Sequence, residues 1–266
     1  MKVAISTNVR DEDNVLEWVA YHKLIGFDHI LVVDHRSIKP VANYLKVPDT
    51  TVIRYNGQPV NPKIHLLNNI VLPFMRRHKI DWFIHLDIDE YLNLNSNYES
   101  IHELLGSLDP AVNIVAFNWV MFGSNGHNKQ PPGLVMENFI KCARSHPAVK
   151  TLVKTAVVVN CTHVHFWSVK QPRGVDANGR AWRVGFANTT TRGIDDLAYI
   201  NHYNIQSYQY YLKRKVNRRT DDGARRTRKS RTQIHTLYNS VENKSICKFI
   251  PAVKAAIKEY SSCLSK

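Results

Sequence analysis

The sequence predicts a three-layer α/β domain with a mostly parallel central sheet and a mixed second half. Three observations support this fold class. Apolar β-rich runs alternate with helical patterns near the amino terminus, the joints between them are short, and the runs end in polar residues. A chain of 266 residues with 44% hydrophobic content is long enough for one such domain with an appendage.

The first elements form a predicted βαβ unit. Residues 2–8 and 28–34 are rich in Val and Ile, which favours two strands. Between them Val15 and Trp18 lie at helical spacing, and Gly26 supplies a left-handed stop. Because the joints are short, the two strands should be parallel, and their carboxyl ends should share the sheet edge where ligands of α/β sheets bind.

The later elements follow from the same patterns. Further strands are expected at residues 51–55, 81–86, 113–122, 150–160, 162–167 and 198–203. Further helices are expected at residues 61–78, 98–108, 207–219 and 249–260. The strands at 150–160 and 162–167 should be antiparallel. We expect one domain over residues 1–219 and a basic, helical extension over residues 220–266, packed on the domain or trailing it.

An apolar run that ends in clustered carboxylates is the most informative stretch. Residues 82–86 have the character of a buried strand, and Asp87, Asp89 and Glu90 follow; we call these three the acidic motif. On an extended segment Asp87 and Asp89 leave from the same face while Ile88 faces the core. Two hard carboxylates favour Mg²⁺ or Mn²⁺, whose other sites bind water and substrate phosphates. A chance Asp-x-Asp pair is the alternative, but so apolar a setting is costly for unpaired charge.

Several classes of protein are disfavoured by what the sequence lacks. The four cysteines have no CxxC spacing, so neither a disulfide framework nor a zinc knuckle is indicated. Neither GxGxxG nor GxxxxGK[ST] occurs, which leaves a Rossmann site or a P-loop unsupported. No signal peptide or stretch of membrane-spanning length is found, and we expect a soluble, cytoplasmic protein.

The net charge of +14 is unevenly distributed. Between Lys213 and Arg231, ten Lys or Arg face Asp221 and Asp222, a local balance of +8. This segment could hold phosphates, an acidic glycan or an anionic membrane surface, or it could be a solvated basic face. It also supports a second hypothesis, a nucleic-acid-binding protein. Paired aspartates at strand ends support a third, a metal-dependent phosphohydrolase.

Five ordered segments carry a resemblance to a known family. They are residues 13–18 (DNVLEW), 26–30 (GFDHI), 81–92 (DWFIHLDIDEYL), Trp119 with 122–127 (FGSNGH), and 200–203 (INHY). Together they resemble the GT-A glycosyltransferases of the family-2-like and family-92-like group, from residue 2 to about residue 219. The resemblance implies transfer of a sugar from a nucleotide diphosphate sugar, a UDP- or GDP-sugar, to a glycan or glycoconjugate, with Mn²⁺ or Mg²⁺. It implies no specific nucleic-acid partner.

The resemblance also implies roles for individual residues. Asp87 and Asp89 bind the metal, with His202 as the candidate third ligand and His165 as its alternative. The donor-binding candidates are Thr7, Asn8, Arg10, Asp34, Lys63 and Asp87. The acceptor-binding candidates are Trp119, Gly123, Ser124 and His127, although the glycine-bearing loop could equally be a simple turn.

The resemblance favours inversion at the transferred sugar, and the residues alone leave the stereochemistry open. An inverting transfer needs a general base within hydrogen-bond reach of the acceptor hydroxyl. The Glu-Asp pair typical of family-2 enzymes is not evident in this sequence. The candidates for the base are Glu90, His127 and Asp176, with Glu137, Asp195 and Asp196 as further carboxylates.

Overall fold

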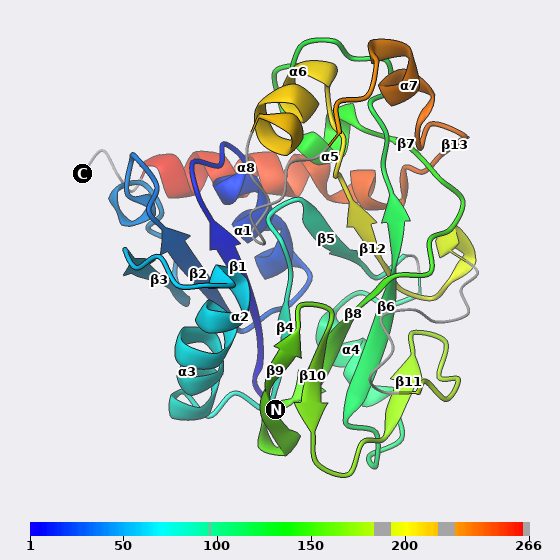
Figure 1. Cartoon of the computed structure of the whole chain (residues 1–266). Helices are drawn as coiled ribbons and strands as arrows, with labels where there is room; N and C mark the ends of the chain where they lie inside the picture. The colour runs from blue at the N-terminus through cyan, green and yellow to red at the C-terminus, as the bar shows by residue number, and fades with distance from the viewer. Residues whose placement is uncertain (96, 184–192, 218–226, 263–266) are drawn as a thin grey trace.

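The first four strands of the chain are parallel to one another, as predicted (Figure 1). The computed structural model describes residues 1–95, 97–183, 193–217 and 227–262. The four strands are β1 (Val3–Val9), β2 (His29–His35), β3 (Thr50–Tyr55) and β4 (Trp82–His85), in the order β3-β2-β1-β4. The helix α1 (Val15–Leu24) joins β1 to β2 and is followed by Gly26, whose φ of 93° is the left-handed value expected.

One long helical segment joins β3 to β4 over nearly the residues predicted. It begins as α2 (Pro62–Leu66), continues through the π turn η2 (Leu67–Val71) and ends as α3 (Leu72–Arg77). Pro73 has no N–H to donate to the preceding turn of an α-helix, which accounts for the irregular turn before it.

The second half adds strands of both directions. β8 (Val149–Lys154) lies between β4 and β6 (Ile114–Met121) and is antiparallel to both. β12 (Tyr199–His202) runs parallel to β6 and antiparallel to β5 (Glu90–Asn93). With β11 (Gly174–Asp176) beside β6, the nine-stranded sheet has the order β3-β2-β1-β4-β8-β6-β12-β5. The predicted class, α/β with a mostly parallel sheet and a mixed second half, is confirmed.

Two strand boundaries are wrong in the prediction. Residues 150–160 do not form one strand, because the 3₁₀ turn η3 (Thr155–Val157) separates β8 from β9 (Val158–His163). β9 forms an antiparallel hairpin with β10 (Phe166–Val169) in a separate two-stranded sheet. The expected antiparallel pair exists, but the turn of the hairpin falls within the expected strand 162–167. β5 was not predicted, because four residues are too few to show a period.

The remaining elements complete the described chain. They are η1 (Val41–Asn43), α4 (Ile101–Gly106), α5 (Val135–Asn138), β7 (Lys141–Cys142), η4 (Gly193–Asp195), α6 (Tyr208–Tyr211), η5 (Leu212–Val216), α7 (Arg231–Thr236), β13 (Val241–Glu242), η6 (Ser245–Phe249) and α8 (Ile250–Ser262). The helix expected at 207–219 corresponds to α6 and η5, and its last two residues lie outside the described part. None of the described helices is both long and apolar enough to cross a membrane.

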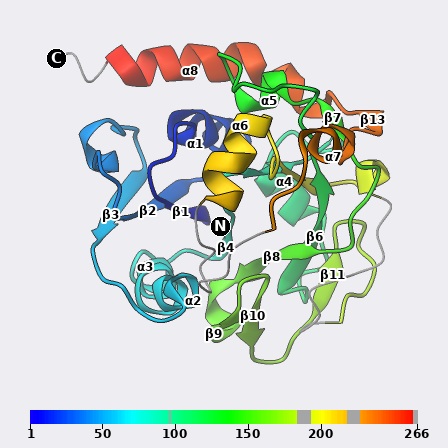
Figure 2. The same cartoon turned by 45° about the horizontal axis from the view of Figure 1, so that its top comes forward.

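Helices cover both faces of the sheet, which produces the three layers predicted (Figure 2). On one face α1, α4, α5 and α8 enclose a core that contains Trp18, Leu104 and Val253. On the other face α2 and α3 pack with the β9–β10 hairpin, and their core contains Met75 and Trp167. Strands buried from both sides explain why the sequence runs are continuously apolar instead of alternating.

Candidate functional site

The polar ends of the parallel strands meet at one edge of the sheet. The register places Ser6 beside His85 and Val9 beside Asp34. The acidic motif follows β4 at this edge. Neighbouring parallel strands end on the same side, so the local sequence was sufficient to predict this meeting.

The acidic motif lies in a turn and not in the extended segment that the sequence suggested. The backbone N–H of Glu90 donates to the carbonyl of Asp87 at 2.9 Å, and the N–H of Asp87 donates to Glu90 Oε2 at 2.9 Å. Ile88 is 6% exposed and faces the core, as expected. The turn leaves 33% of the Asp87 side chain exposed but only 8% of the Asp89 side chain.

Two lysines from distant elements bind the Asp87 carboxylate. Lys63, in the first turn of α2, donates to Asp87 Oδ1. Lys150 Nζ lies 3.3 Å from Asp87 Oδ2 and 3.4 Å from Glu90 Oε2, and this lysine is only 2% exposed. Lys150 reaches the site because β8 is antiparallel to β4, which brings the beginning of β8 to the edge where β4 ends.

Asp89 has its own pair of cationic or polar neighbours. Lys215 Nζ, from η5, donates to Asp89 Oδ2 at 2.7 Å. His202 Nε2 lies 3.7 Å from Asp89 Oδ1. His202 ends β12 and is the register partner of Glu90 on β5, so two strands hold the imidazole and the acidic motif side by side.

Burial and charge shift the pKa values of the acidic motif in opposite directions. Burial alone would raise the pKa of Asp87, but Lys150 and Lys63 outweigh it and hold this pKa well below its usual range. The pKa of Asp89 is likewise lowered against burial, by the ammonium group and the imidazole beside it. Burial raises the pKa of Glu90 despite Lys150. Asp87 and Asp89 are therefore ionised at neutral pH.

The helical turn that carries Lys215 is anchored by its neighbour Arg214. The guanidinium donates to the carbonyl oxygens of Asp11 at 3.0 Å and of Arg10 at 3.1 Å, and it pairs with the carboxylate of Glu12. These contacts fasten η5 to the loop after β1, in front of the strand ends (Figure 2). Part of the predicted basic segment is thus engaged with the domain, while residues 218–226 of that segment lie outside the described residues.

Buried polar atoms without a hydrogen-bond partner gather at the same edge. Within the described residues they include Thr7 Oγ1, Asn8 Oδ1, His85 Nε2, Glu90 Oε1, Trp119 Nε1 and His202 Nδ1. A buried polar group without a partner typically costs about 1–3 kcal/mol. Such groups are rare in folded proteins, so their concentration here indicates a surface that binds a polar ligand.

An aromatic cluster surrounds Trp119 on β6. Its ring centroid lies 4.4 Å from that of His202, 4.9 Å from His165 and 5.8 Å from His146. His165 donates from Nδ1 to the carbonyl oxygen of Val149 at 2.7 Å. Burial lowers the pKa of His165 to about 4, so this ring is neutral at pH 7. The structure thus places both predicted histidines beside the predicted acceptor-binding tryptophan.

Asp34 uses its carboxylate to shape the loop after β2. Asp34 Oδ1 accepts from the N–H of Ser37 at 2.9 Å, and Oδ2 accepts from the N–H of Val41 at 3.0 Å and from Arg54 Nη1 at 3.1 Å. The residue is fully buried. It lies at the predicted sheet edge, and its part in donor binding stays a prediction.

The glycine-bearing loop at residues 122–127 is covered by the segment that follows α7. A Cβ on Gly123 would lie 2.6 Å from the carbonyl oxygen of Leu237, so this glycine allows close approach of the chain's own backbone. Ser124 is buried and bonds His235 Nδ1 at 2.9 Å. His127 is half-buried, with its ring 5.6 Å from that of Phe139.

Asp176 is not brought to the acidic motif. β11 pairs Asp176 with Ala116, whereas β6 reaches the site at Met121, and the residues between span about 16 Å of strand. Asp176 accepts from Arg180 Nε at 2.7 Å, which stabilises the turn after β11. Of the further carboxylates, Glu137 pairs with Lys254 at 2.8 Å, Asp195 with Arg144 at 3.8 Å, and Asp196 accepts from the N–H of Gly193 at 3.0 Å.

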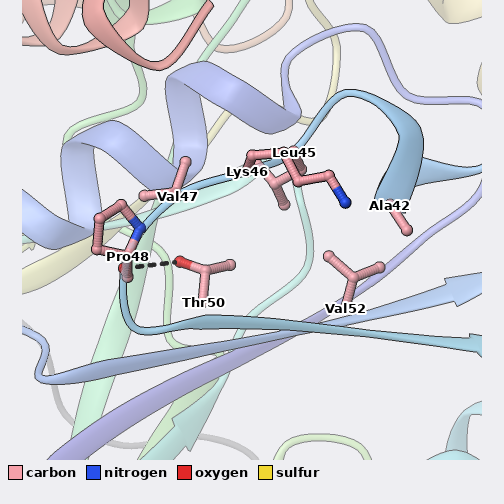
Figure 3. A pocket seen from close by; sticks show the side chains of 7 residues that line it. All are labelled: Ala42, Leu45, Lys46, Val47, Pro48, Thr50 and Val52. Carbon is pink, nitrogen blue, oxygen red and sulfur yellow. Dashed lines mark hydrogen bonds between the residues drawn. The ribbon is translucent and has the colours of Figure 1, made fainter. Parts of the chain in front are cut away.

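A pocket of about 420 Å³ lies elsewhere, beside the beginning of β3 (Figure 3). Its lining is largely apolar, and its charged residue is Lys46. Thr50 Oγ1 donates to the carbonyl of Pro48 at 3.5 Å across its floor. Since β3 begins at the opposite edge from the carboxyl ends of the strands, this pocket is separate from the acidic motif.

The profile of glycosyltransferase family 92 matches residues 74–242, which is more than half of the chain. The chain belongs to this family. The matched segment contains the acidic motif, Lys150, His202 and Lys215, whereas β1 to β3 precede it. As a member of family 92, the protein is a glycosyltransferase, and the resemblance seen in its sequence is confirmed at that level.

Solved structures give weaker likenesses, and no curated protein sequence matches the chain. A CMP:2-keto-3-deoxy-manno-octonic acid synthetase complexed with CTP is 12% identical, with 59% of this chain and 75% of that chain covered and a TM-score of 0.31. A glycosyltransferase involved in the glycosylation of the major capsid of the virus PBCV-1 is 13% identical, with 58% of this chain and 60% of that chain covered and a TM-score of 0.29. At these TM-scores we draw nothing about function from either structure.

At the strand ends of this family 92 enzyme, the side chains offer the kinds of donor atom that a divalent cation binds. Asp87 and Asp89 supply ionised oxygens, and His202 supplies a buried imidazole. In the described part of the chain, no three His, Cys, Asp or Glu side chains already form a metal-binding group. Lys215 lies on Asp89 instead.

Sequence reasoning missed two lysines of this site in the family 92 chain. Lys150 lies at the beginning of a predicted strand, and a lysine in the run VKTLVK, which contains a second lysine at 154, is a weak signal of a buried partner. Lys215 could not be distinguished from the other basic residues between Lys213 and Arg231.

Proposed function

We propose that this enzyme transfers a sugar, with inversion, from a UDP- or GDP-sugar to a hydroxyl group of a glycan or glycoconjugate, assisted by Mn²⁺ or Mg²⁺. The observation that supports this most is the meeting of Asp87, Asp89 and His202 with unpaired buried polar atoms at one sheet edge. A nucleoside diphosphate leaves with developing negative charge, and cationic groups positioned in advance stabilise it. Inversion follows from the resemblance alone.

Different residues of the site would bind the cation, the polar groups of the donor and the sugar ring. A bound cation supplies positive charge beside the leaving diphosphate, and Asp87, Asp89 and His202 are the residues that would hold it. Thr7 and Asn8 offer unpaired polar atoms at the end of β1, next to the strand end that carries the motif. Trp119 offers an aromatic ring, onto which the apolar face of a sugar can pack.

The test is thermal unfolding with nucleotide sugars. UDP-, GDP-, CMP- and dTDP-sugars are each added with Mn²⁺ and with EDTA. A ligand at 100 times its Kd stabilises the folded state by about 2.7 kcal/mol, which raises the melting temperature by several degrees. We expect a shift for one nucleotide class, present with Mn²⁺ and lost with EDTA.

A pair of variants ties the result to the acidic motif. Asp89→Asn removes the buried charge at the site and should abolish the Mn²⁺-dependent shift. Asp81→Asn is the matched control, because Asp81 precedes β4 at the opposite end and its side chain is 56% exposed. The proposal fails if folded Asp89→Asn protein keeps the full shift, or if the parent protein shows none with any donor.

A further inference from the structure

The ammonium group of Lys215 lies where a cation would contact Asp89. Its Nζ is 2.7 Å from Asp89 Oδ2, while the other oxygen, Oδ1, faces His202 Nε2 at 3.7 Å. Both partners of the lysine contact are largely buried, with 18% of the Lys215 side chain and 8% of the Asp89 side chain exposed. A positive charge is thus already present on the predicted metal ligand.

The carboxylates of the cluster do not outnumber its ammonium groups, even with Glu90 counted as ionised. Three carboxylates, those of the acidic motif, contact three ammonium groups, those of Lys63, Lys150 and Lys215. A dication added to this arrangement would leave an excess positive charge at a poorly hydrated site, which is costly. Cation binding therefore requires that an ammonium group moves away, that an anion binds with the cation, or both.

Lys215, the lysine that lies on Asp89, can move more easily than Lys150. Lys150 is 2% exposed, contacts two carboxylates and projects from a central strand. Lys215 contacts one carboxylate and projects from η5, whose position is separately held by Arg214. A lysine has a long flexible stem with a rotatable ammonium group, so its side chain can turn while the helical turn stays in place.

On the basis of the proposed function, we infer that Lys215 is an exchangeable ligand of this site. Before the cation binds, its ammonium group occupies the position on Asp89 that the cation would take. When the cation and donor bind, the ammonium group turns to the diphosphate oxygens. Lys215 therefore opposes binding of the metal alone and supports binding of the nucleotide with the metal, so that the two ligands bind cooperatively.

The experiment measures these two affinities separately in Lys215→Met, which retains an apolar stem without the charge. Mn²⁺ alone is titrated and free Mn²⁺ is followed by electron paramagnetic resonance. UDP and GDP are then titrated by calorimetry at saturating Mn²⁺. We expect Lys215→Met to bind Mn²⁺ alone about tenfold more tightly, and to bind the nucleotide with Mn²⁺ about tenfold more weakly, each equivalent to about 1.4 kcal/mol.

Two further variants complete the design. Lys213→Met removes the same charge from an exposed position of the same helical turn, and should match the parent in both titrations. Lys215→Arg keeps the charge and should bind Mn²⁺ alone like the parent. Lys215→Gln replaces the methionine variant if thermal melting shows that the latter does not fold.

The two expected affinity changes of Lys215→Met have opposite signs, whereas a purely structural role of Lys215 would weaken both kinds of binding. If Lys215→Met binds Mn²⁺ alone no more tightly than the parent, or if Lys213→Met tightens it equally, Lys215 is not the competitor and the inference is overturned. If the parent shows Mn²⁺-dependent nucleotide binding while these variants are unchanged, only this inference fails. If the folded parent binds neither Mn²⁺ nor nucleotide, the proposed function fails with it.

Discussion

Lys150 shows how one residue determines the state of the acidic motif. It is almost completely buried and contacts both Asp87 and Glu90, and those carboxylates raise the pKa of its ammonium group against the effect of burial. A buried ion pair contributes little net stability, but removing one partner leaves an uncompensated charge. Removing Lys150 would therefore destabilise the acidic motif, even though its ion pairs add little net stability.

We predict that Lys150→Met lowers the free energy of unfolding by about 3–5 kcal/mol, because Asp87 and Glu90 lose their buried partner. Urea unfolding followed by circular dichroism measures this. The double variant Lys150→Met/Glu90→Gln should recover part of the loss. Lys154→Met, at the other end of β8, is the control and should change stability by about 1 kcal/mol or less. A loss below about 1 kcal/mol in Lys150→Met would contradict the assigned role.

Among the elements, α1 and α5 are joined by one buried carboxylate. Glu17 of α1 accepts the N–H of Val135 at 2.8 Å and that of Met136 at 3.0 Å, at the beginning of α5. The first N–H groups of a helix have no partner within it, and Glu17 supplies one from outside. Burial nevertheless raises the pKa of Glu17 from 4.5 to about 7, since these hydrogen bonds offset only part of the desolvation.

This shift predicts a pH dependence of stability. The folded protein retains a proton on Glu17 that the unfolded chain releases above pH 4.5, so the contribution of Glu17 to stability falls as the pH rises from 4.5 to about 7, by at most about 3 kcal/mol. Burial lowers the pKa values of His22 and His165, and these two groups contribute with the opposite sign as the pH rises towards 6.5. Urea midpoints between pH 5 and pH 8 measure the slope. Compared with the parent, Glu17→Gln should gain stability as the pH rises across this range, whereas Glu137→Gln, at an exposed position of α5, should keep the slope of the parent. The same slope in parent and Glu17→Gln would refute the assignment.

At the scale of the whole molecule, α8 is part of the packed structure. It lies along α1 on one face of the sheet (Figure 2), and Val253 is fully buried in the core of that face. Ile257 and Tyr260, at helical spacing from Val253, pack against the same core. The end of the chain therefore adds to the layer that supports β1 and β2. The boundary predicted between residues 219 and 220 falls outside the described residues.

We predict that Val253→Ala lowers the free energy of unfolding by about 2 kcal/mol, because it leaves a cavity between α8 and α1. Lys258→Ala, exposed on the same helix, is the control and should stay within about 0.5 kcal/mol of the parent. A single cooperative transition in both is expected. If Val253→Ala matched the parent, α8 would not contribute to the cooperative unit.

The local patterns of the sequence determined the framework of this protein. Alternating apolar runs and helical spacing are properties of neighbouring residues, so the βαβ unit, the long helix before β4 and the acidic motif at its end followed from them. The meeting of Asp34 and Asp87 at one sheet edge also followed, because parallel strands end together. The match to family 92 then showed that the sequence specifies a glycosyltransferase.

The tertiary structure alone decided which groups surround the acidic motif. Whether β8 pairs with β4 depends on packing across both faces of the sheet, and no local pattern encodes it, yet this pairing delivers Lys150. Lys215 lies far along the chain from Asp89, and its partner was chosen among many carboxylates by the position of η5. Ion pairs and strand partners of this kind are set by distance in space, which is why the sequence pattern singled out Asp87 and Asp89 but neither Lys150 nor Lys215.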